Sequence, residues 1–257
     1  MRLLPIPSAS RNHMHIHLPR GAATSLIGAL LLAAATTKPV QAQSVEVVRT
    51  PDGWLITHHH SQGSRSTLTV PSVPILLARM ERVAPEDPPR AMMIMSSVLG
   101  ESEHLPRAVI DSIFDGLQHL AATSRSAEVR STSVSLLTIA GAQDEATGSR
   151  VARRLVRLYH QTSDTDIRQR LISYSFPVLA EASSALGLMR VVATQNGVRE
   201  DFPNAAEWAI SGLLHMDEGG RAVLRDLHER GLVTDPKARG TLAALSRNGF
   251  RLPNRGP

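Results

Sequence analysis

The stretch that decides the fold is Ser126–Gln161, which reads SAEVRSTSVSLLTIAGAQDEATGSRVARRLVRLYHQ. Ser126 is a suitable helix N-cap, because its hydroxyl can accept a hydrogen bond from a free N–H of the first turn. Apolar residues then recur on one helical face as far as the turn Gly141–Asp144, and a second apolar stripe follows from Val151 to Leu158. Neither helix can bury its stripe alone, so the sequence predicts a helical hairpin that needs similar neighbours.

Segments with the same plan recur along the chain, with starts 33 to 40 residues apart. The starts are Glu86, Ser126, Asp164, Phe202 and Asp235. Small or apolar residues stand three and eight positions after each start, and arginine stands four positions after four of the five. Three columns in the same register predict an internal repeat. The columns are Pro89, Val129, Ile167, Ala205 and Ala238; Arg90, Arg130, Arg168, Ala206 and Arg239; and Ile94, Val134, Ile172, Ile210 and Ala243.

The openings of three repeats resemble the start of a HEAT repeat, which reads Asp-Pro-x-Val-Arg in that family. These openings are Ser126–Arg130, Asp164–Arg168 and Asp235–Arg239, and the likeness covers about 86–248. The start at Phe202 lacks the cap and the arginine, and the cap at Glu86 is poor.

The resemblance implies an α-solenoid in which the arginine and the aspartate tie adjacent repeats together. We carry that structural role over to Arg130, Arg168 and Arg239 only.

The predicted fold class is all-α: a solenoid of about four HEAT-like hairpins with terminal half-repeats. The second helices of the hairpins are expected at 105–122, 146–160, 182–194 and 218–230. A half-repeat is expected at each end, at 73–83 and 236–246. The predicted organisation is a signal peptide at 1–42, a β-prone arm at 43–72, the solenoid at 73–247 and a disordered tail at 248–257.

Residues 1–42 have the three parts of a secretory signal peptide. Three arginines precede a ten-residue apolar run, Leu26–Ala35, and a small-residue cleavage site ends at Ala42. We therefore expect cleavage after Ala42 and a secreted or periplasmic protein, with an amphipathic or buried N-terminal helix as the alternative. The apolar run is too short to span a bilayer, so no membrane span is expected after cleavage.

The charge and the composition exclude several classes of function. Removing residues 1–42 takes away four of the 28 basic residues and none of the 23 acidic ones, which leaves a net charge of +1. Binding to nucleic acid is not expected, because it needs a surplus of cations. The chain has no cysteine, which excludes disulfides and a thiol nucleophile.

The β-prone arm contains three consecutive histidines, His58, His59 and His60. Residues on a strand point alternately to opposite faces, so the three cannot share one metal ion without a bend. We interpret the run as a polar loop. Trp54, beside a turn glycine, is expected to pack as a lid on the first helices.

No motif with known catalytic mechanics is present, so we do not expect an enzyme, and no cofactor is implied. The turns inside the hairpins are acidic, and with His104 and His215 they offer an alternative divalent-cation site. Helix-dipole stabilisation explains the same carboxylates more simply. They are Glu101, Glu103, Asp144, Glu145, Glu181, Asp217 and Glu218.

The expected second helices carry many arginines, which we interpret as a candidate partner-binding stripe. The alternative is a solvated face in which Asp111, Asp115, Asp226 and Glu229 pair with it. Reversal of Arg150, Arg154 and Arg157 to Glu is expected to leave the fold intact. The candidate binding residues are Arg150, Arg154, Arg157, Arg190, Arg221 and Arg225, with Arg107 and Arg153 on the same helices.

The function that the sequence favours is a protein-binding or scaffolding module. Its expected partners are envelope or secreted proteins, with an acidic segment where they meet the arginine stripe, or a polyanion of the cell surface. One rival is a purely structural component of an envelope complex. The other is a metal-dependent enzyme that uses His58–His60 and the acidic turns. Of the aromatic residues, Trp208, Phe176 and Tyr174 fall in helical patterns and are expected in the core.

Overall fold

The computed structural model describes residues 44–61, 63–179, 183–194 and 202–251, all within the compact unit Gln43–Pro257. The expected signal peptide, Glu181 and residues 252–257 of the expected tail lie outside the described residues. The described part is mostly helical and begins with a small three-stranded sheet. Within it, no helix has both the length and the apolar character needed to cross a membrane.

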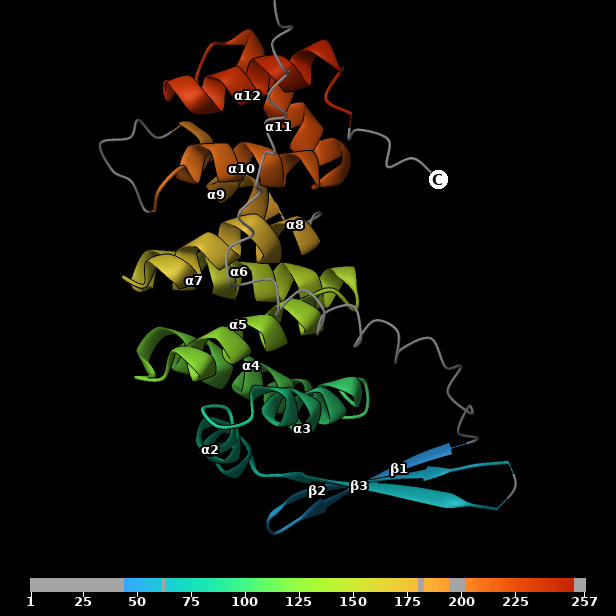
Figure 1. The fold of residues 1–257 in the computed structure, drawn as a ribbon. Helices are drawn as coiled ribbons and strands as arrows, with labels where there is room; N and C mark the ends of the chain where they lie inside the picture. Colours follow the sequence, from blue (N-terminus) through green and yellow to red (C-terminus); the bar gives the residue numbers. More distant parts are fainter. Residues whose placement is uncertain (1–43, 62, 180–182, 195–201, 252–257) are drawn as a thin grey trace, which may run out of the picture. The chain divides into compact units, whose positions relative to one another are not determined.

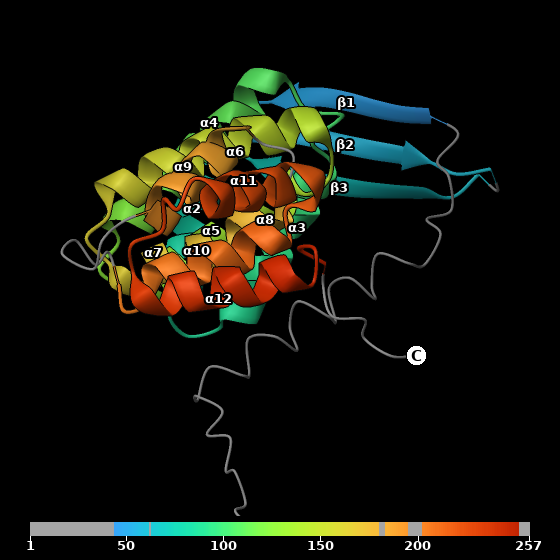
Figure 2. The ribbon, with the colours of Figure 1, turned by 90° about the horizontal axis from the view of Figure 1, so that it is seen from above.

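The expected β-prone arm forms an antiparallel sheet with the strand order β1-β2-β3, whose strands lie side by side in Figure 2. The strands are β1 (Ser44–Thr50), β2 (Gly53–His59) and β3 (Arg65–Pro71). Gly53 follows the tight turn after β1 at φ 150°, and a Cβ there would lie 2.1 Å from the carbonyl oxygen of Val70. This close approach is why the turn needs glycine.

The two faces of β2 differ, because alternate residues point to opposite sides of a strand. Ile56 is fully buried, and His58 shares its face. His59 points to the other side. The strand therefore separates neighbouring histidines, as the alternation predicts.

Helices follow the sheet in chain order (Figure 1). They are α2 (Val73–Val83), α3 (Pro88–Gly100), α4 (Arg107–Thr123), α5 (Ala127–Gly141), α6 (Glu145–Gln161), α7 (Thr165–Arg170), the π-helical turn η1 (Leu171–Ser175), α8 (Phe176–Val178), α9 (Ser183–Thr194), α10 (Ala205–Leu214), α11 (Asp217–Glu229) and α12 (Pro236–Arg247). The expected helix boundaries are met to within about two residues, which is the usual uncertainty of helix ends.

The helices pack in two rows. In the first-helix row, α3 contacts α5, α5 contacts α7 and η1, η1 contacts α10, and α10 contacts α12. In the second-helix row, α2 contacts α4, α4 contacts α6, α6 contacts α9, and α9 contacts α11. Contacts between the rows, such as α4 with α5 and α9 with α10, bury the apolar stripes of both.

Side-chain caps fix most helix starts of the first-helix row. Ser126 accepts a hydrogen bond from the Val129 N–H at 3.2 Å, and Asp235 accepts one from the Ala238 N–H at 2.7 Å. At α10 the N-cap is Asn204 in a left-handed conformation with no side-chain cap bond, in keeping with the weak opening of that repeat.

The register predicted for the first repeat is wrong by one residue. The N-cap of α3 is Asp87, which accepts a hydrogen bond from the Arg90 N–H, so Glu86 is not the cap. As a result Pro89 is exposed, and Met95 is fully buried in place of Ile94. Two consecutive prolines at the helix start explain the shift, since proline suits the first helical positions and Asp87 directly precedes them.

The first helix of the third repeat contains a π-turn, which the sequence pattern does not reveal. Within it, Ser175 is buried and accepts a hydrogen bond from the Thr138 hydroxyl on α5 at 2.7 Å. The turn buries Leu171 and Ile172 and leaves Tyr174 outside.

The described residues after α12 are ordered by packing, although the sequence predicts a disordered tail from 248. Phe250, in the segment predicted to be a tail, is buried, and its ring meets that of His228 edge-on at 6.2 Å. Its N–H bonds to the Leu245 carbonyl at 2.9 Å, so α12 ends in an ordered turn.

Candidate functional site

The arginine stripe on α6 is engaged in ion pairs with α4. Arg150 lies 3.2 Å from Asp111, and Arg154 lies 3.1 Å from Asp111 and 2.8 Å from Asp115. Both guanidinium groups also lie over the ring of Phe114, at 5.9 and 5.7 Å from its centroid. These arginines therefore join two helices of the second-helix row, as the pairing alternative predicts.

The other members of the stripe are also placed beside partners of their own. Arg157 donates a hydrogen bond to the Gln118 side chain at 3.5 Å. Arg190 on α9 pairs with Asp226 on α11. Arg221 and Arg225 both pair with Glu218 of their own helix, and their hydrogen bonds hold the pKa of that carboxyl below its ordinary value.

Most of the acidic turns serve as helix starts. Asp144 caps α6 by accepting a hydrogen bond from the Thr147 N–H, and hydrogen bonds from Thr147 lower the pKa of its carboxyl. Glu145, Asp217 and Glu218 lie in first helical turns, where the dipole favours negative charge. His215 is exposed and belongs to no metal-ligating group among the described residues.

Two aromatic residues expected in the core are on the surface instead. Tyr174 is 44% exposed and Trp208 is 41% exposed, whereas Phe176 is fully buried as predicted. Tyr174 lies on η1 and Trp208 on α10, and these two elements pack against each other. The helical spacing of apolar residues could not predict the exposure of Tyr174, because this residue lies in the π-turn, which interrupts that spacing. Trp54 is half-buried, and Arg49 lies over its ring at 5.8 Å.

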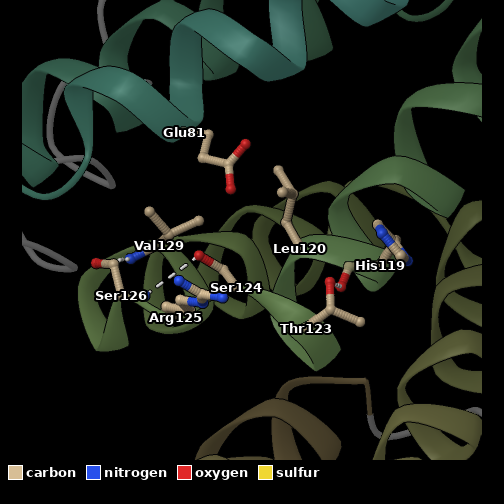
Figure 3. A pocket seen from close by; sticks show the side chains of 8 residues that line it. All are labelled: Glu81, His119, Leu120, Thr123, Ser124, Arg125, Ser126 and Val129. Atoms are coloured by element: carbon tan, nitrogen blue, oxygen red, sulfur yellow. Dashed lines mark hydrogen bonds between the residues drawn. The ribbon is translucent and has the colours of Figure 1, made fainter.

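A pocket of about 490 Å³ lies where α2, α4 and α5 meet (Figure 3). Its polar groups already stabilise the helix ends: Ser126 caps α5, and the Thr123 hydroxyl bonds to the His119 carbonyl at 2.9 Å. No nucleophile–base pair is formed among these lining residues, which are Glu81, His119, Leu120, Thr123, Ser124, Arg125, Ser126 and Val129.

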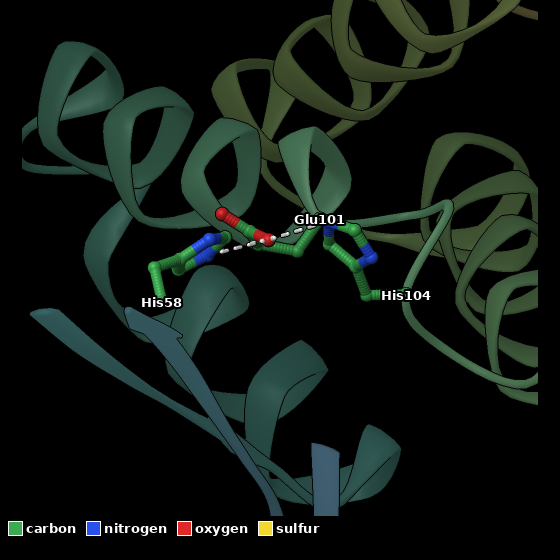
Figure 4. A group of neighbouring side chains, drawn as sticks. All are labelled: His58, Glu101 and His104. Atoms are coloured by element: carbon green, nitrogen blue, oxygen red, sulfur yellow. Dashed lines mark hydrogen bonds and ion pairs between the residues drawn. The ribbon is translucent and has the colours of Figure 1, made fainter. Parts of the chain in front are cut away.

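The structure brings together one potential metal-ligating group in the described part of the chain: His58, Glu101 and His104 (Figure 4). His58 Nε2 lies 3.0 Å from Glu101 Oε2, and His104 Nε2 lies 3.8 Å from the same oxygen. The two imidazole rings meet edge-on, with centroids 5.7 Å apart. All three side chains are half-buried. Two imidazoles and a carboxylate are donors that suit zinc.

The neighbouring histidines do not join this group. His59 Nε2 lies 3.7 Å from Glu46 Oε2 on the other face of the sheet, and His60 Nε2 lies 3.0 Å from the Ser66 hydroxyl. The polar-loop interpretation of the run is wrong for His58 and His59, which end strand β2. The sequence contained both halves of the group, but only the fold shows that they meet.

Comparison with models of known protein families, with curated proteins and with solved structures finds no match.

Proposed function

We propose that this protein is an exported HEAT-like α-solenoid that acts as a protein-binding or scaffolding module. The observation that supports it is a series of side-chain links between helices of the same row at nearly constant sequence separation. Arg130 and Asp164 are 34 residues apart, Arg190 and Asp226 are 36 apart, and Arg150 and Asp111 are 39 apart. Repeating units that contact only their neighbours would produce such a series, and such arrays offer extended binding surfaces.

The proposal of export rests on the expected signal peptide. An exported protein would meet its partner among envelope or secreted proteins. Mass spectrometry of the protein from its native host should find a mature N-terminus at Gln43. A chain that keeps Met1 in the cytoplasm would contradict this part of the proposal.

The binding surface includes two exposed aromatic side chains, Tyr174 on η1 and Trp208 on α10, which lie on elements that pack against each other. Tyrosine and tryptophan are, together with arginine, enriched among the residues that dominate binding energy at interfaces. These two rings are exposed, whereas most of the arginine stripe is engaged in ion pairs. The arginine stripe is a second candidate surface, and Arg153 and Arg157 are its exposed members on α6. Their guanidinium groups would suit an acidic segment of the partner.

Affinity capture from the native envelope tests the proposal and separates the two surfaces. One variant combines Tyr174→Ala with Trp208→Ala, and the matched variant combines Arg153→Glu with Arg157→Glu. We expect the first to lose the partner and the second to retain it, with helical circular dichroism unchanged in both. Loss only in the arginine variant would move the binding surface to α6. A parent protein that captures nothing would contradict the binding function.

A purely structural role makes a different prediction for the same experiment. The protein would then be recovered only within a stable complex extracted by detergent, and neither pair of surface substitutions would release it.

A further inference from the structure

We propose that His58, Glu101 and His104 bind one divalent transition-metal ion of the zinc class. Their donor atoms all lie within 4.8 Å of one another. Around a tetrahedral ion with bonds of about 2.0–2.1 Å, neighbouring ligand atoms lie roughly 3.3 Å apart. The separations of 3.0 Å and 3.8 Å from Glu101 to the two histidines bracket this value. The two histidine donor atoms lie within 4.8 Å of each other, so the imidazoles would move toward one another to bind the ion.

The donor types select the class of metal. Two imidazole nitrogens suit zinc, copper and nickel, whereas calcium and magnesium prefer oxygen ligands. The chain has no cysteine, so a thiolate site is excluded. Two histidines and a glutamate leave a fourth position for water.

The backbone holds two of the ligands in place before any ion arrives. The His104 N–H donates a hydrogen bond to the Glu101 carbonyl at 3.0 Å, which closes one turn around both residues. This turn follows the last residue of α3, and His58 reaches it from β2 (Figure 4). Preorganised ligands lower the entropic cost of binding.

The charge at this helix end favours a cation. Glu101 is the C-cap of α3, where the helix dipole is negative, and the last turn of α3 has no basic residue. Glu103 adds a second carboxylate, 3.3 Å from His104 Nε2. A divalent ion would offset negative charge that the helix end otherwise disfavours.

The ion would also connect two parts of the fold. His58 and Glu101 are 43 residues apart in the sequence and belong to the sheet and the helices respectively. The sheet also contacts α2 through β3. We therefore expect the bound ion to protect β2 from local opening.

Titration calorimetry with zinc chloride, on the expected mature protein Gln43–Pro257 freed of metal by a chelator, tests the site. We expect one equivalent of zinc to bind and calcium to give no heat. His58→Ala and His104→Ala should each weaken zinc binding by about tenfold or more. The matched control is His59→Ala, which removes the adjacent imidazole on the opposite face of β2 and should leave the affinity unchanged.

A second measurement keeps the proposal falsifiable if a variant is less stable. Zinc should raise the Tm of the parent and of His59→Ala but not that of His58→Ala, because a ligand stabilises only the state that binds it. Glu101→Gln keeps the size of the side chain, removes its charge and should also weaken binding. Absence of stoichiometric zinc at micromolar concentrations, or equal affinity in the His58 and His59 variants, would overturn the proposal.

Discussion

Arg130 on α5 binds the carboxylate of Asp164, the residue that caps the next helix of its row. Its Nε and a terminal nitrogen lie 2.7 and 2.6 Å from Asp164 Oδ2, while Oδ1 accepts hydrogen bonds from the Asp166 and Ile167 N–H groups. One aspartate therefore starts a helix and ties it to the preceding repeat. The role expected for Arg130 is present at this position. Arg168 lies over the ring of Tyr159, at 5.5 Å.

A double-mutant cycle on this pair should give a clear coupling energy. We expect Arg130→Ala and Asp164→Ala to be coupled by about 1–2 kcal/mol in urea unfolding, because the two side chains are mostly buried and in direct contact. The matched control is the pair Arg221 and Glu218, which is exposed within one helix and should show far weaker coupling. Equal coupling energies in the two cycles would show that the ion pair between repeats stabilises the fold no more than an exposed pair does.

The same aspartate predicts a pH dependence. Burial would raise the pKa of the Asp164 carboxyl, but hydrogen bonds from the Ile167 N–H and from Arg130 outweigh it and hold the pKa below the ordinary 3.8. A pKa lowered by folding adds stability that is complete above the unfolded value and is lost as the pH falls through the folded one. We expect Asp164→Asn to destabilise the protein at pH 7, and the difference from the parent to vanish in strong acid. A constant difference in urea unfolding at both pH values would contradict this assignment.

Charge reversal on α6 should depend on which arginine is changed. Arg154→Glu would place a carboxylate beside Asp111 and Asp115, so we expect a loss of about 1–3 kcal/mol in the free energy of unfolding. Arg153→Glu alters the exposed neighbour and should stay within about 0.5 kcal/mol of the parent. We also expect the triple reversal of Arg150, Arg154 and Arg157 to lower stability, since two of these arginines are paired with α4. Similar stabilities for the two single variants would contradict the observed pairing.

Two residues of the π-turn, Ile172 and Tyr174, should respond very differently to substitution. Ile172 is fully buried, so Ile172→Asp would bury an unpaired charge and cost several kcal/mol. Tyr174→Ala removes an exposed ring two residues away and should leave the thermal transition nearly unchanged. Thermal unfolding followed by circular dichroism measures both, and an unchanged transition in the Ile172 variant would show that the register of η1 is wrong.

Much of the helical part could be predicted because each helix carries its own signals. Caps such as Ser126 and Asp235 and the spacing of apolar residues act within one or two turns, so they can be read from the sequence. The predicted register of the first repeat was wrong by one residue, because Asp87, followed by two prolines, caps the helix in place of Glu86. The prediction that Tyr174 lies in the core was wrong, because the π-turn interrupts the helical periodicity on which it was based.

The candidate sites were harder to predict, because they depend on distances between separate segments. His58 and the acidic turn at Glu101 were both predicted as possible ligands. The spacing of residues along the sequence does not show which acidic turn lies near β2. The arginine stripe on α6 could be located in the sequence. Its pairing with Asp111 and Asp115 was one of two alternatives that only the packing of α4 on α6 decides.

Photo-crosslinking in the native host tests the central claim, a partner-binding surface at Trp208, most directly. A photoreactive phenylalanine derivative would replace Trp208 on α10 in one variant and the exposed Ala222 on α11 in the matched control. The account predicts a covalent adduct with another envelope or secreted protein from position 208 and none from position 222. Adducts from position 222 alone, or from neither position, would contradict it.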